Sequence, residues 1–271
     1  MTTVSSPGRP EQPAPAYVTG HGLLDGKVVV VTAAAGAGIG AAVVRRVLEE
    51  GAKAVVFSDT HERRLAEAQE SLAGEFGADR VVSAVCDVTD EAAVQALLDR
   101  ADALGGVDVM INNAGLGGTA SVLEMTDEQW SRVLDITLTG TFRCVRAAGA
   151  RMVEQGKRGV IVNNASVIGW RAQEGQAHYA AAKAGVMALT RCAALDLAPH
   201  GIRVNAVSPS LAMHPFLAKV TSDDLLAELK RREAFGRAAE PWEVANVMVF
   251  LASDYASYLT GEVVSVSSQH A

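Results

Sequence analysis

A tyrosine and a lysine four residues apart, Tyr179 and Lys183, form the pattern Y-x-x-x-K. On a helix, such positions share one face, so the phenol and the ammonium can act together. A free tyrosine has a pKa of about 10 and is a poor base at neutral pH, but a nearby cation favours the phenolate. Ser166 precedes this pair at the expected end of a strand, where its hydroxyl can hold a substrate oxygen. Alone the pattern is common on protein surfaces; beside a nucleotide motif it predicts an acid/base centre.

A glycine-rich turn, GAGIGA at 36–41, fits the pattern G-x-G-x-x-G/A. Gly36, Gly38 and Gly40 leave room for the backbone to approach a pyrophosphate, which a Cβ would block. The helix that this turn opens offers N–H groups and a positive dipole to the phosphates. A glycine turn without a ligand is the alternative, but the strand before it and the helix after it favour a bound dinucleotide.

Two acidic residues at strand ends bear on which dinucleotide this is. Asp59 ends the second strand at the spacing expected for a residue that bonds the ribose hydroxyls and repels a 2′-phosphate. The next residue is Thr60, so NAD is favoured over NADP, with Arg63 and Arg64 expected to be solvated. Asp87, which ends the third strand, suits either an adenine contact or the N-cap of the following helix.

The sequence NNAG at 112–115 ends the fourth strand. Its small residues allow the chain to pass close to a ribose and a nicotinamide. An ordinary turn at a strand end is the alternative interpretation.

These motifs fall between short Val/Ile-rich runs and longer helical stretches that alternate along the chain. The expected strands are 28–32, 54–58, 80–85, 107–111, 160–164, 203–207 and 261–266, and the expected helices are 41–51, 61–72, 91–104, 127–154, 177–197 and 241–253. Strands that are apolar throughout are typical of a parallel sheet covered on both faces. We therefore predict an α/β fold: a single-domain, Rossmann-type, doubly wound parallel sheet, with its site beyond the carboxyl ends of the strands.

Composition narrows the classes of partner. The chain has 271 residues and a net charge of −7, which gives no electrostatic reason to bind nucleic acid or an anionic membrane. No apolar run is long enough for a membrane helix. The three cysteines, Cys86, Cys144 and Cys192, show no metal-ligand spacing and indicate free thiols in a cytoplasmic protein. The proline-rich residues 1–20 are predicted to be a disordered tail before one domain at 21–271.

Taken together, the motifs resemble the short-chain dehydrogenase/reductase family over about residues 22–268, with the stretch VNAVSP at 204–209 adding to the match. The resemblance implies hydride transfer to or from a nicotinamide, with Tyr179 exchanging the hydroxyl proton and Lys183 also holding the nicotinamide ribose. It implies a homotetramer built from the helices that contain Cys144 and Cys192. The cofactor contacts expected are Gly36, Gly38, Ile39, Gly40, Asp59, Asp87, Val88, Asn113, Ala114, Gly115, Tyr179, Lys183, Pro209 and Ala212.

Several positions depart from the family pattern. The turn lacks its first glycine and has one extra residue, so Thr32 and Ala33 are expected to begin a wider phosphate turn. Thr137 stands where the family has its catalytic asparagine, and we expect activity to persist with a changed proton relay. His214 stands where the family has a threonine that meets the carboxamide, and the terminal glycine pair is absent from VSVSSQHA.

An apolar segment at about 211–236 is expected to form a lid over the site, which suits a bulky hydrophobic substrate, although packing as a helix pair is the default interpretation. The substrate contacts expected are Ser166, Trp170, Gln176 and His214. The segments VTAAAGAGIG, NNASVIGWRAQ and SVSSQHA resemble a bacterial branch linked to degradation of the steroid nucleus, whose substrates are bicyclic ring remnants carried as acids or coenzyme A thioesters.

Other functions fit parts of the same sequence. A 3-oxoacyl thioester reductase, acting on acyl-carrier-protein or CoA substrates, has the same chemistry but generally prefers NADPH, which Asp59 disfavours. A non-catalytic nucleotide-sensing protein keeps the fold but is expected to lose the tyrosine or the lysine, and both are present here. A purely structural oligomer would not need Ser166, Tyr179 and Lys183 in register. No metal site is expected.

Overall fold

The computed structural model describes residues 12–213 and 223–269. In these ranges seven strands form one parallel sheet in the order β3-β2-β1-β4-β5-β6-β7, which confirms the predicted fold class. The strands are β1 (Val28–Val31), β2 (Ala54–Asp59), β3 (Val81–Val85), β4 (Val109–Asn112), β5 (Val160–Asn164), β6 (Arg203–Pro209) and β7 (Val263–Val266). The order reverses between β1 and β4, and a ligand crevice in such a sheet lies outside the carboxyl ends at that point.

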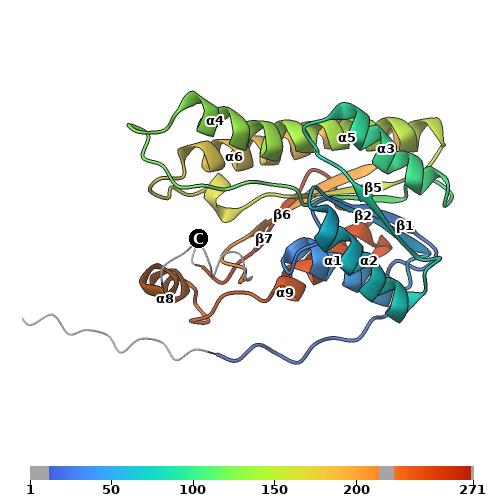
Figure 1. Ribbon diagram of the computed structural model, residues 1–271, viewed down its shortest axis with the longest axis horizontal. Coiled ribbons are helices and arrows are strands. Elements are labelled where there is room, and N and C mark those ends of the chain that lie inside the picture. The colour runs from blue at the N-terminus through green and yellow to red at the C-terminus, as the bar shows by residue number, and fades with distance from the viewer. Residues whose placement is uncertain (1–11, 214–222, 270–271) are drawn as a thin grey trace, which may run out of the picture.

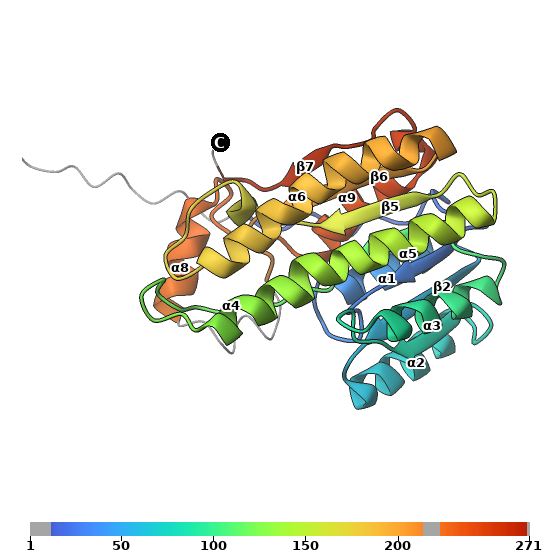
Figure 2. The same cartoon turned by 90° about the horizontal axis from the view of Figure 1, so that it is seen from above.

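Helices cover both faces of this sheet (Figures 1 and 2): α1, α2 and α9 lie on one side, and α3, α4, α5 and α6 on the other. Their bounds are α1 (Ile39–Glu49), α2 (Glu62–Phe76), α3 (Glu91–Asp102), α4 (Asp127–Leu134), α5 (Gly140–Glu154), α6 (Ala177–Leu197), α8 (Asp223–Arg232) and α9 (Pro241–Ala252). In β1, Val29 and Val31 join the core under one layer, and Val28 and Val30 join the core under the other. Burial on both sides explains why the strands show no polar alternation.

The predicted helix at 127–154 is wrong at its centre, because a π-helical turn, Asp135–Thr139, separates α4 from α5. There the N–H of Gly140 bonds the Asp135 carbonyl, five residues back. A Cβ at Gly140 would lie 2.6 Å from Cγ2 of Val88, so only glycine allows this close approach. Turns of this kind are frequent at functional sites, and this one contains Thr137.

Both described ends of the chain reach the segment after α8. The N–H of Gln12 donates to the Phe235 carbonyl at 3.0 Å, and Ala234 N–H donates to the Ser268 carbonyl at 2.8 Å. Between Gln12 and β1 the chain follows the outside of α1, where Tyr17 packs edge-on against Trp242 with ring centroids 5.3 Å apart. Residues 12–20 contain no helix or strand, and residues 1–11 of the predicted tail lie outside the described ranges.

Candidate functional site

The ends of β1, β4 and β5 are joined by polar side chains. The Thr32 hydroxyl accepts from the backbone N–H groups of Asn113, at 3.0 Å, and Ala114, at 3.1 Å. The Asn113 amide donates to the Ala33 carbonyl at 2.9 Å and accepts from the Asn164 amide at 3.0 Å. This network fixes the NNAG segment across the point where the strand order reverses.

Ser166, Tyr179 and Lys183 lie together beyond the end of β5. Helix α6 begins at Ala177, so Tyr179 is in its first turn and Lys183 one turn later on the same face. The Lys183 ammonium lies 5.6 Å from the centre of the Tyr179 ring and donates to the Asn164 carbonyl at 2.5 Å. Ser166 bonds the Tyr179 phenol through its hydroxyl, and both Ser166 and Lys183 are buried.

The electrostatics differ from the simple expectation of a lysine that lowers the tyrosine pKa. Burial raises the pKa of Tyr179, and its hydrogen bond with Ser166 only partly opposes this. Burial also lowers the pKa of Lys183 to about 8. Desolvation disfavours the charged form of each group, so in the chain by itself the phenol is held protonated, in the form of an acid.

Thr137 is fully buried, and its hydroxyl is already engaged. It accepts from the Leu116 N–H at 2.9 Å and donates to the Leu116 carbonyl at 3.2 Å. A Cβ placed on Gly115 would lie 3.4 Å from Lys183 Nζ and 3.7 Å from Thr137 Oγ1, so these two side chains flank the same glycine. Thr137 therefore holds the loop after NNAG in place. A role in a proton relay stays a prediction.

The glycine turn fits a pyrophosphate. A Cβ at Gly40 would lie 2.5 Å from both the Ala33 carbonyl oxygen and Asn113 Nδ2, whereas Gly36 faces open space. Gly38 is the N-cap of α1 and no side chain caps it, so the first-turn N–H groups that start at Ile39 remain available for an anion. Ala33 adopts a left-handed conformation, with φ 53°, directly after Thr32. The chain thus makes a glycine-type bend without the glycine.

Asp59 lies against this turn and accepts from Ala35 N–H at 3.2 Å and from His61 N–H at 3.1 Å. Arg64 comes within 3.5 Å of the Asp59 carboxylate, so the expectation that it is merely solvated is wrong. Asp87 accepts from the backbone and hydroxyl of Thr89.

The N-cap of α3 is Asp90, whose carboxylate accepts from Ala92 N–H at 2.8 Å. The alternative that made Asp87 this cap is therefore wrong, because the helix begins three residues later than that interpretation required. Val88 is buried against Gly140. Pro209 ends β6, and Ala212 is bridged to Ala239.

The residues expected to contact the substrate differ in their exposure and in their hydrogen bonds. Trp170 is half exposed, at 49% of its surface, on the segment after Ser166. Gln176 instead donates to the Gly118 carbonyl at 2.7 Å and to the Thr119 hydroxyl at 3.2 Å, which ties the loop after β4 to the start of α6. His214 lies outside the described residues.

His178, the neighbour of the tyrosine, is not among the site residues expected from the sequence. It is buried, its Nδ1 accepts from Tyr179 N–H at 2.9 Å, and its Nε2 lies 3.3 Å from the Cβ position of Gly118. It supports the same loop that Gln176 ties down. Its position directly before Tyr179 was the one available signal.

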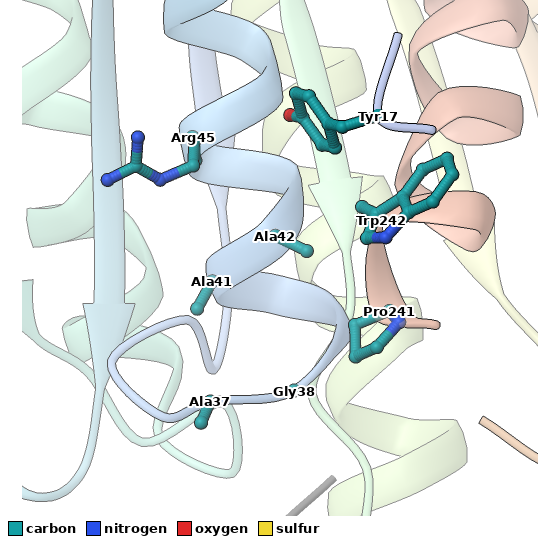
Figure 3. A pocket seen from close by; sticks show the side chains of 8 residues that line it. All are labelled: Tyr17, Ala37, Gly38, Ala41, Ala42, Arg45, Pro241 and Trp242. Atoms are coloured by element: carbon teal, nitrogen blue, oxygen red, sulfur yellow. The ribbon is translucent and has the colours of Figure 1, made fainter. Parts of the chain in front are cut away.

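A cavity of about 300 Å³ lies on the outer side of α1, beside the glycine turn (Figure 3). It is lined by Tyr17, Ala37, Gly38, Ala41, Ala42, Arg45, Pro241 and Trp242. None of these side chains belongs to the group around Tyr179. Among the described residues, no cluster of three or more His, Cys, Asp or Glu side chains is arranged to hold a metal ion. In the same ranges, no helix has the length and apolar character needed to cross a membrane.

A sequence profile of the family described as "Enoyl-(Acyl carrier protein) reductase" matches residues 33–268. A relative in Mycobacterium tuberculosis, "(5R,7aS)-5-hydroxy-7a-methyl-1-oxo-2,3,5,6,7,7a-hexahydro-1H-indene-carboxyl-CoA reductase", is 62% identical over 258 residues, which cover 95% of this chain and 98% of the relative. A "3-alpha-(or 20-beta)-hydroxysteroid dehydrogenase" of the same species is 42% identical, over 89% of this chain and 87% of its own length. The crystal structure of a short chain dehydrogenase from Mycobacterium smegmatis superposes with a TM-score of 0.84 at 56% identity, covering 96% of this chain and 99% of that one.

Proposed function

We propose a specific reaction for this chain, which belongs to the short-chain dehydrogenase/reductase family of oxidoreductases. It interconverts a secondary alcohol and a ketone on a bulky ring substrate that is carried as a coenzyme A thioester, with NAD(H) as cofactor. The observation that carries the proposal is the grouping of Ser166, Tyr179 and Lys183 beyond β5. The substrate that gives the 62% identical relative its name, a hydroxylated bicyclic carboxyl-CoA compound, supports the substrate class.

Each residue of the group has a distinct task in this reaction. The Ser166 hydroxyl, next to the phenol, holds the substrate oxygen beside Tyr179. Tyr179 gives its proton to that oxygen during ketone reduction and takes it back during alcohol oxidation. Lys183, fixed by the Asn164 carbonyl, supplies a cation that steadies the phenolate form once the proton has left. Thr137 keeps the loop at Leu116 in register with this group.

The glycine turn and the strand ends fit a dinucleotide. The open N–H groups at the start of α1 would hold the pyrophosphate, and the segment at Asn113, Ala114 and Gly115 would lie along the nicotinamide ribose. When bound, the nicotinamide ring accepts or gives the hydride. Asp59, held against the turn by Ala35 N–H, favours NAD, because its carboxylate repels a 2′-phosphate. Asp87, Val88, Pro209 and Ala212 are proposed as further cofactor contacts.

We also propose a cytoplasmic homotetramer. Large apolar side chains are exposed on α5, at Phe142 and Val153, and on α6, at Leu195. These are the helices that contain Cys144 and Cys192. Exposed apolar groups on neighbouring helices of one layer are typical of a face that pairs with another copy.

A 3-oxoacyl thioester reductase remains the second candidate, since the matching family profile is described by an acyl-carrier-protein substrate. That reaction uses the same catalytic group but linear substrates, and generally NADPH. A non-catalytic sensor is disfavoured because the buried Ser166 and Lys183 lie together with the half-buried Tyr179.

The test is turnover with NAD or NADP across hydroxylated bicyclic CoA thioesters and linear 3-hydroxyacyl-CoA compounds. We expect turnover of the ring thioesters with NAD, and a loss of the preference for NAD in Asp59→Ser. The matched control is Asp25→Ser, which changes one carboxylate away from the turn. Turnover of linear thioesters alone, or with NADP alone, would move the chain to the second candidate.

A further inference from the structure

Arg171 stands out among the arginines near the proposed active site. It lies on the segment between Ser166 and Tyr179, just after the short helical turn Val167–Gly169. Its backbone N–H donates to the Val167 carbonyl at 3.0 Å. The segment follows the carboxyl end of β5, so it borders the place where the substrate must sit. Trp170, half exposed, lies next to it.

The Arg171 guanidinium has a neutral partner. Its Nη1 donates to the side-chain carbonyl of Gln269 at 2.5 Å. Within residues 12–213 and 223–269 no Asp or Glu forms an ion pair with it, whereas Arg151 is paired with Asp99 and Asp102. A guanidinium bonded to an amide keeps its full charge and further N–H donors for an anion.

The orientation of that amide is fixed by a buried carboxylate. Gln269 Nε2 donates to Glu233 Oε1 at 2.8 Å, so its carbonyl must point to Arg171. Glu233 is only 3% exposed and also accepts from the Ser268 hydroxyl at 2.8 Å. A buried carboxylate costs free energy unless donors surround it. Here the donors are the side chains of Ser268 and Gln269 and, at 3.4 Å, the Leu211 N–H, and the result is an oriented amide that faces the guanidinium.

We propose that Arg171 is a specificity-determining residue that binds the anionic part of the substrate, and that Gln269 and Glu233 position it. The anion is a carboxylate on the ring compound or a phosphate of its coenzyme A carrier; both suit the planar guanidinium, which binds two oxygens at once. Gln269 separates Glu233 from the guanidinium, so the carboxylate orients the cation without pairing with it. This inference rests on the proposed ring substrate.

The experiment uses one bicyclic secondary alcohol in three forms: the CoA thioester, the free carboxylic acid and the uncharged methyl ester. We expect Arg171→Ala to raise KM for the anionic form by about tenfold to a hundredfold, the range for a lost charged hydrogen bond. KM for the methyl ester, and kcat throughout, should stay within about twofold. The control Arg100→Ala removes an exposed charge at the end of α3 and should change none of these values.

The three forms identify the anion. A rise in KM for the thioester alone assigns a phosphate, and a rise for the free acid assigns the carboxylate. Glu233→Gln and Gln269→Ala should give smaller rises in KM for the same form, because they loosen the arginine without removing it, and Arg171→Lys should recover part of the affinity.

Two outcomes overturn the inference in distinguishable ways. Equal losses on all three forms, methyl ester included, would make Arg171 a purely structural residue while leaving the proposed function intact. A wild-type enzyme that turns over none of the three ring compounds would overturn the proposed function and this inference with it.

Discussion

The glycine turn before α1 and the first two turns of α6 lie at the same edge of the sheet but depend on opposite properties of their residues. At the turn, the proposed cofactor site needs side chains to be absent: Gly40 lies against the Ala33 carbonyl and the Asn113 amide, and a Cβ there would lie 2.5 Å from both. On α6, the proposed acid/base centre needs two particular side chains, the half-buried Tyr179 and the buried Lys183, with their polar atoms engaged.

Substitutions in the two regions should therefore affect different properties of the protein. A substitution in the turn should act mainly on stability and cofactor binding, through the backbone. A substitution on α6 should act mainly on proton transfer, and it can even relieve an unfavourable burial.

The strongest test of the difference between the two regions is Tyr179→Phe, which removes the phenolic oxygen and keeps the packed ring. We expect turnover of the ring thioester to fall by about 10²- to 10⁴-fold, because the proton donor and acceptor is lost. Binding of NADH, followed by fluorescence titration, should persist. Tyr255→Phe, at a tyrosine that is 80% exposed, is the control. If Tyr179→Phe kept its turnover, the acid/base role would be wrong.

Lys183 should carry a cost of burial that depends on pH. Its pKa falls from 10.5 in the unfolded chain to about 8 in the folded one, so between these values the unfolded chain binds more protons and stability rises with pH. We expect wild type to gain up to about 3 kcal/mol relative to Lys183→Met across this window, measured by urea unfolding. Cys86, whose pKa burial raises to about 11, contributes with the opposite sign but equally in both proteins. A constant difference between pH 8 and 10.5 would contradict this assignment.

The turn is tested by a pair of identical changes at two glycines. Gly40→Ala should destabilise the chain by about 1–3 kcal/mol through overpacking against backbone atoms. Gly36→Ala, which meets no atom within 4 Å, should stay within about 0.5 kcal/mol of wild type. Urea unfolding without cofactor gives both values. Equal effects would show that close approach at Gly40 is not what requires glycine.

The smallest effect is expected at Ala33, the alanine with φ 53°. Ala33→Gly should relieve about 1–2 kcal/mol of left-handed strain but loosen the unfolded chain, for a net gain of up to about 1 kcal/mol. Ala35→Gly, where the backbone is not left-handed, should lose stability instead. The midpoint temperatures of thermal unfolding of the two variants should therefore shift in opposite directions. Shifts in the same direction would show that Ala33 is not strained.

Much of the fold could be read from local patterns. Helix α6 occupies the predicted range Ala177–Leu197, and the parallel sheet follows from strands that are apolar on both faces. The π-helical turn at Asp135–Thr139 could not be predicted, because its setting is tertiary: Gly140 against Val88, and Thr137 bonded to Leu116. No periodicity within the helix marks such contacts.

Some residues of the candidate site could likewise be predicted from the sequence, and others could not. Spacing along one helix brings Tyr179 and Lys183 together, so the sequence was sufficient for that pair. The link from Arg171 through Gln269 to Glu233 joins three segments that are far apart in the chain, and only the fold reveals it. The left-handed conformation of Ala33 could not be predicted either, because alanine gives no local signal for that conformation.

The contacts of Gln12 with Phe235 and of Gln269 with Glu233 bring the two described ends of the chain to one short segment. Chains whose ends are neighbours can be circularly permuted. A short linker between these ends, with new ends opened at the exposed turn after Phe76, would preserve the order of strands in the sheet. In such a permutant the linker would lie beside the segment after α8, which contacts both Gln12 and Gln269.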